Sequence, residues 1–116
     1  MKQFTAVFLG TEGKMKEWSG LSPEARKERE QKGMAAWGNW VETNKESIVV
    51  MGSPLGKTLK VDKGGVSPTK NELTAFTVVQ AETHEAAAKL FLNHPHFSIF
   101  PGDSIEVMEN LPIPGQ

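Results

Sequence analysis

Residues 2–9, KQFTAVFL, decide much of the fold, because they predict a strand with apolar side chains on both faces. In an extended chain, successive side chains point to opposite faces of the sheet. Phe4, Ala6 and Phe8 therefore share one face, and Val7 and Leu9 share the other. A strand with one face in water would alternate apolar and polar residues. We therefore expect this strand to be covered on both faces.

The segment that follows begins with a glycine-rich stretch, residues 10–20, which we expect to be a loop. A long helix should come next, since Ser22 suits the N-cap and Pro23 the first helical position. The helix should end near Thr43 or Asn44. Apolar residues spaced by 3 and 4 give it one buried stripe. That stripe consists of Gly33, Met34, Trp37, Trp40 and Val41.

The rest of the chain predicts three more strands, a second helix and a last strand. Residues 47–52 are β-branched and apolar, and residues 57–62 and 72–80 should form a pair of strands joined by a loop with two glycines and a proline. A second helix should run from near Thr83 to His94, where the following proline ends it. Residues 104–109 alternate and predict the final strand.

This order of elements is the ferredoxin-like split βαβ plan with an added strand, which is an α+β fold. Its antiparallel sheet would be covered by two helices on one face only. Because the strands are apolar on both faces, the second face needs another cover, most simply a second copy of the chain. We expect one domain over residues 1–116, with its core in 2–110 and a proline-rich tail in 111–116, acting as a homodimer.

Composition excludes several classes of function. The chain has 116 residues, with 13 basic and 14 acidic side chains, so nothing suggests binding to nucleic acid or to an anionic membrane. Cysteine and tyrosine are absent, which excludes thiolate nucleophiles, cysteine metal sites and phenolic acids. No apolar run is long enough to span a membrane or to act as a secretory signal, so a cytoplasmic location is expected.

Residues 52–58, GSPLGKT, resemble a phosphate-binding loop but are one residue too short. Such a loop also needs a helix start to direct its amides at phosphate. The following residues predict a strand instead, and Pro54 removes one amide. We therefore expect no nucleotide and no other cofactor.

The stretch NHPHF at 93–97 places His94 and His96 on the same side if the chain is extended. Three interpretations are open. The pair could bind a metal, but the only other histidine is His84, about three helical turns away, so we predict no metal site. One ring could transfer protons, since imidazole titrates near neutral pH. Alternatively, one ring only caps the carbonyl end of the helix.

Asp103 could orient one of these histidines, as the third member of a catalytic triad does. The sequence PGD at 101–103 is also common turn chemistry, so a purely structural role stays open. Trp18, Trp37 and Trp40 could line a ligand pocket between sheet and helices. The spacing of Trp37 and Trp40 suits packing in the core equally well.

Taken together, these stretches resemble the YCII-related (DGPF-domain) family of small bacterial proteins. The resemblance covers nearly the whole chain and lies in the order of its motifs. The motifs are the paired Trp37 and Trp40, MGSPLG at 51–56, QAET at 80–83, EAAA at 85–88, HPHF at 94–97, PGDSIEV at 101–107 and LPIPG at 111–115.

The resemblance implies a dimeric α+β barrel, in which two sheets pack face to face, and a pocket where a histidine and an aspartate carry acid–base chemistry. Two departures matter. The first 83 residues contain no histidine, so the role would pass to His94 or His96, and MGSPLG stands where the family carries Asp-Gly-Pro-Phe. Two functions stay open: a lyase or isomerase acting on a small organic molecule with His94, His96 and Asp103, or a non-catalytic ligand-binding or regulatory module.

Overall fold

The computed structural model describes residues 1–115 and has an α+β fold built on one antiparallel sheet. Its strands are β1 (Lys2–Leu9), β2 (Ile48–Pro54), β5 (Leu73–Ala81) and β6 (Ser104–Glu109). They lie in the order β2-β5-β1-β6, and every pair is antiparallel. This is the order of the split βαβ plan, so that expectation is confirmed.

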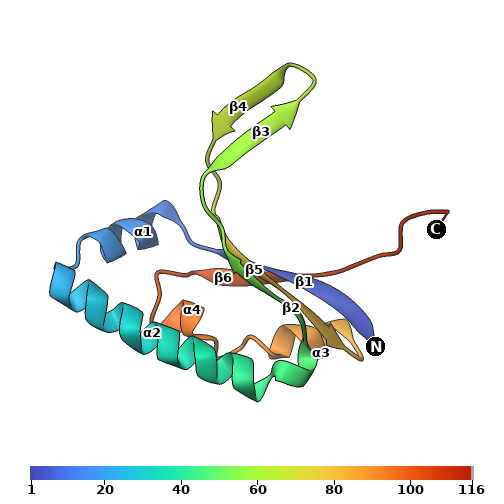
Figure 1. Cartoon of the computed structure of the whole chain (residues 1–116), viewed down its shortest axis with the longest axis horizontal. Coiled ribbons are helices and arrows are strands. Elements are labelled where there is room, and N and C mark those ends of the chain that lie inside the picture. The colour runs from blue at the N-terminus through green and yellow to red at the C-terminus, as the bar shows by residue number, and fades with distance from the viewer. Residues whose placement is uncertain (116) are drawn as a thin grey trace.

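Helices cover one face of this sheet and leave the other bare (Figure 1). They are α2 (Pro23–Thr43), α3 (His84–Lys89) and α4 (Pro95–Ser98). The helix α1 (Glu12–Ser19) lies beyond the end of the sheet, and a 3-10 turn, η1, forms at Lys45–Ser47. The buried core lies under them, where Phe4, Ala6 and Phe8 of β1 meet Ala87 and Phe91. The expected start of α2 is confirmed, because the Ser22 hydroxyl accepts a hydrogen bond from the Ala25 amide.

The glycine-rich segment 10–20 is not the loop that we predicted, because most of it forms α1. Thr11 caps this helix, and Glu12 pairs with Lys16 one turn later. The amide of Gly20 closes the helix on the Lys16 carbonyl. Local capping and charge pairing therefore outweigh the cost of Gly13 inside the helix.

We predicted that residues 57–62 would pair with residues 72–80, and this prediction is wrong. They form β3 (Thr58–Asp62), which pairs with β4 (Gly65–Thr69) in a separate two-stranded hairpin. Gly65, at a φ of 125°, permits the tight turn, since few other residues adopt this conformation. The hairpin stands away from the sheet on the side opposite the helices (Figure 1).

The second helix is also shorter than predicted. It ends at Lys89, and residues 95–98 form α4 as a separate turn of helix that begins after His94. Met34, placed by its spacing in the buried stripe, is instead 66% exposed, while Gly33 of the same helix is buried. Among the described residues, no helix combines the length and apolarity needed to cross a membrane.

Candidate functional site

His94 lies at the centre of an aromatic cluster beneath α2. Its ring meets Trp37 edge-on at 4.3 Å between ring centres, Trp40 at 4.8 Å and Phe8 at 4.9 Å. Phe8 in turn stacks on Trp37 at 5.3 Å. The His94 side chain is fully buried. It reaches this place because β1 and α2 present their aromatic residues to the same layer.

The hydrogen bonds of His94 define which nitrogen carries its proton. Nδ1 accepts the backbone N–H of His96 at 3.0 Å, so His94 caps α4 at its amino end. The proton of the neutral ring is therefore on Nε2, which has no hydrogen-bond partner within residues 1–115. Burial, and then the nearby His96 ring, lower the pKa of His94 to about 3. His94 is thus a neutral ring that holds the next turn of chain in place.

His96 is held by a different set of bonds. Its Nε2 lies 2.9 Å from the Leu9 carbonyl oxygen and 3.1 Å from the Ser104 carbonyl oxygen. Both oxygens can only accept, so Nε2 must carry a proton and donate it. In the neutral ring, this leaves a lone pair on Nδ1. Burial lowers the pKa of His96, against the opposite effects of the two carbonyls and of Asp103.

Gly102 supports His96 from one side. A Cβ added at this glycine would overlap the atoms of the imidazole ring, so only glycine allows the loop to pack flat against it. The amide of Gly102 also donates to the His96 carbonyl at 3.1 Å. The PGD segment, which we interpreted as a turn or an orienter, therefore places the ring through its glycine.

Asp103 does not touch either histidine through its carboxylate. That carboxylate accepts the Thr11 backbone N–H at 2.6 Å, and this bond is the main reason that the pKa of Asp103 is lowered. The Asp103 amide donates to the Leu9 carbonyl, the same oxygen that holds His96. The two carbonyls, rather than the aspartate, orient the imidazole. The charge of Asp103 still acts on His96, whose pKa it raises.

A cavity of about 440 Å³ opens beside His96, between α2 and the ends of β2 and β5. Methionines from three elements surround it: Met15, Met34 and Met51. The rings of Trp37 and Phe100 contribute aromatic walls, β5 contributes residues 74–76, and the polar side chains are those of Ser53, Thr74 and His96. Among the residues described, no acidic side chain, lysine or arginine lines this cavity.

A bulge in β2 shapes the sheet side of the cavity. Pairing between β2 and β5 shifts between Val50 and Ser53. Gly52 lies in the shift with a φ of 75°, where a Cβ would collide with the Phe76 carbonyl. The bulge turns residues on both sides of Gly52 toward the cavity.

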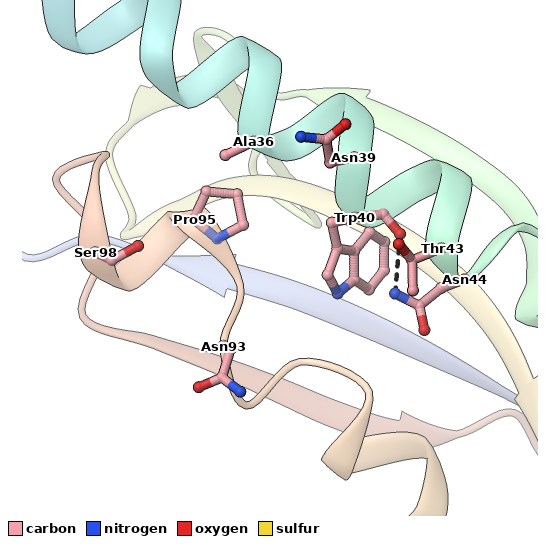
Figure 2. Close-up of a pocket in the computed structure, with 8 residues that line it drawn as sticks. All are labelled: Ala36, Asn39, Trp40, Thr43, Asn44, Asn93, Pro95 and Ser98. Atoms are coloured by element: carbon pink, nitrogen blue, oxygen red, sulfur yellow. Dashed lines mark hydrogen bonds between the residues drawn. The ribbon is translucent and has the colours of Figure 1, made fainter.

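A second, smaller pocket of about 250 Å³ lies between α2 and residues 93–98 (Figure 2). It is lined by amides, hydroxyls and Trp40, and neither His94 nor His96 lines it. The Asn44 side chain donates to the Trp40 carbonyl at 2.9 Å, which ties it to its own helix. With no titratable group on its wall, this pocket is not where proton transfer would occur.

The three tryptophans occupy three different places. Trp37 lines the cavity beside His96. Trp40 lines the smaller pocket and donates its indole N–H to the Leu90 carbonyl at 2.9 Å. Trp18 lies against Phe100, with the Arg29 guanidinium 5.6 Å from its ring centre, and lines neither space. Sequence reasoning missed the three methionines, although soft, flexible side chains are common in binding surfaces.

His84 is remote from this chemistry. Its Nε2 lies 2.7 Å from the Val107 carbonyl oxygen, and its ring packs on Phe4. Within residues 1–115, no group of three histidine, aspartate or glutamate side chains could hold a metal ion. The strand expected after GSPLGKT is present as β3, so no helix start follows those residues.

No protein-family model matches this sequence, and no curated protein matches it. Among solved structures, the chain is similar to 5-chloro-2-hydroxyhydroquinone dehydrochlorinase, TftG, from Burkholderia phenoliruptrix AC1100, which was solved in complex with 2,5-dihydroxybenzoquinone. The TM-score is 0.53 at 18% identity, over 90% of this chain and 89% of that one. This similarity shows that the two chains share an α+β fold with an antiparallel sheet. Membership of the YCII-related family stays a prediction.

Proposed function

We propose that this protein is a cytoplasmic homodimer that binds a small organic ring in the cavity beside His96, and that His96 transfers a proton to and from that ligand. One observation carries this function. Two backbone carbonyls hold the proton on Nε2 of a ring that lines an apolar cavity, which leaves Nδ1 as its basic atom.

The chemistry that suits this arrangement is elimination or isomerisation. In an elimination, Nδ1 of His96 takes a proton from the ligand, the electrons of the broken bond form a new double bond, and the leaving group departs with its own pair. In an isomerisation, the imidazolium returns the proton to another atom of the ligand. Because burial lowers the pKa of His96, the ring is neutral at pH 7 and ready to act as the base. Asp103 then stabilises the imidazolium by its negative charge.

The cavity wall favours a flat and largely apolar ligand. Trp37 and Phe100 offer ring faces and edges, and the methionines adapt to the outline of a ring. The similar enzyme TftG acts on a hydroquinone and was solved with a benzoquinone. A ring compound of this size is the class of ligand that we infer here.

The dimer is inferred from the bare face of the sheet. Val7, Phe76 and Val78 lie on it and are only half-buried in the single chain. Sheets that expose such a face bury it against another layer. A second copy would provide that layer, as the resemblance to the YCII-related family implies.

The experiment compares three proteins: the wild type, His96→Gln and His84→Gln. The probes are hydroquinone and 2,5-dihydroxybenzoquinone for binding by calorimetry, and halogenated hydroquinones for turnover, measured as halide release. Glutamine keeps an N–H for the carbonyls but has no basic lone pair. We expect His96→Gln to keep binding and to lose turnover by about 100-fold or more, while His84→Gln behaves as wild type.

Other outcomes are equally informative. Binding without turnover of any halogenated substrate would favour the non-catalytic ligand-binding module. Turnover that survives in His96→Gln would remove His96 from the mechanism.

A further inference from the structure

The hairpin of β3 and β4, here called the arm (residues 58–69), has two chemically different faces. Leu59 pairs with Pro68 and Val61 pairs with Val66, so these four apolar residues share one face. The other face carries Thr58, Lys60, Asp62, Ser67 and Thr69. Such strict alternation is typical of a sheet that buries one side and exposes the other.

Within the described part of the single chain, nothing covers the apolar face of the arm. Leu59 is 66% exposed, Val61 76% and Val66 65%. An isolated two-stranded hairpin is marginally stable in water at best. The arm therefore needs a surface to pack on.

The radius of gyration also indicates that part of the chain lies outside a compact body. The radius of gyration is 16.0 Å, whereas a compact chain of this length has about 13 Å. The arm and the C-terminal segment extend away from the body of the molecule (Figure 1). The excess size comes from segments that lie beyond the helix-covered layer.

The bare face of the sheet is smaller than a standard protein interface, so the arm could supply part of the missing area. With strands about 4.8 Å apart and a rise of about 3.3 Å per residue, the bare face of four strands covers on the order of 500 Å². A standard interface buries roughly 800 Å² on each partner. The apolar face of the arm adds on the order of 150 Å², and it stands on the same side as the bare face (Figure 1).

We propose that the arm packs its apolar face against a second copy of this chain, as a continuation of the sheet-to-sheet interface. This inference rests on the homodimer proposed above. The occupant is a second copy, because a face of this small area would not hold a partner alone but extends a larger interface that the chain already offers.

Analytical ultracentrifugation of four full-length proteins tests the arm. They are the wild type, Val61→Asp on its apolar face, Lys60→Asp on its polar face, and Val7→Asp on the bare face of the sheet. Val61 and Lys60 are both exposed in the single chain, so neither variant should prevent folding, and circular dichroism checks this. We expect Val61→Asp to raise the dimer Kd by about 10- to 100-fold, as loss of a buried contact does, and Lys60→Asp to change it less than threefold.

The outcomes separate the arm from the dimer. If Val7→Asp separates the protomers while Val61→Asp and Lys60→Asp have equal Kd values, the arm proposal is overturned and the dimer stands. A wild type that is monomeric at all concentrations overturns both. A Val61→Asp effect confined to the binding of a different protein would assign the arm to that partner and also overturn the proposal.

Discussion

The layer under the helices and the parts beyond it differ in how fully one chain completes them. In the helix-covered layer, Phe8 is fully buried among Trp37 and His94. On the arm, Val61 is 76% exposed although its neighbours across the hairpin are apolar too. Apolar residues that alternate along a strand are thus buried in one region and exposed in the other. The difference is that helices of the same chain pack on the first region and not on the second.

This contrast also separates two kinds of role. The helix-covered layer holds the only histidines that are buried among the described residues, so it carries the candidate chemistry. The bare face and the arm carry no such groups, and assembly is the role that we propose for them. Substitutions in the first region should therefore change stability and ligand chemistry, whereas those in the second should change association alone.

Among single substitutions, Gly102→Ala is expected to change stability most. A methyl group there overlaps the ring of His96, whose position is fixed by two carbonyls, so we expect a loss of about 3 kcal/mol in the free energy of unfolding. Gly56→Ala, at the base of the arm, has no atom within 4 Å of the added carbon and should change stability by less than about 0.5 kcal/mol. Urea unfolding of both variants measures the difference, and equal effects would remove the contrast between the regions.

Stability in the helix-covered layer should also depend on pH. The pKa of His94 is about 3 in the folded chain and 6.5 as its ordinary value, so between these pH values the unfolded chain binds one proton more. Stability should therefore be complete above pH 6.5 and fall by about 1.4 kcal/mol per unit as pH decreases toward 3. His96, whose pKa is also lowered, adds to the same slope.

His94→Asn sharpens this pH test. Asparagine keeps an oxygen that can accept the His96 amide but does not titrate. Between pH 4 and 6, the free energy of unfolding of the variant, measured with urea, should depend less steeply on pH than that of the wild type. The difference in slope should correspond to about one bound proton. An unchanged slope would mean that His94 does not stay neutral in the folded protein.

Much of the fold could be predicted because local signals and tertiary packing agree. The strands at 2–9 and 104–109 and the helix after Ser22 have the expected bounds. Our prediction for segment 10–20 is wrong because its glycines favour a loop, whereas the capping bonds of Thr11 and Gly20 stabilise a helix. The sequence does not predict the arm, because Pro68 favours a loop, although a proline is tolerated at the edge of a two-stranded hairpin.

The site was less accessible to sequence reasoning. The spacing of His94 and His96 indicated that both could act, but their difference depends on the distant carbonyls of Leu9 and Ser104. No local sequence pattern shows which ring nitrogen will donate a hydrogen bond to such carbonyls. The methionines that line the cavity come from three separate elements, so only the folded chain brings them together.

The proposed function depends on His96 being a neutral base with its proton fixed on Nε2. Long-range ¹H–¹⁵N correlation NMR of the imidazole rings at pH 7 tests it most directly, with His94→Asn and His84→Gln used for assignment. We predict a neutral His96 ring, protonated on Nε2 and unprotonated on Nδ1. A proton on Nδ1, in either the other tautomer or the imidazolium, would rule out His96 as the base, because no basic nitrogen would then face the ligand.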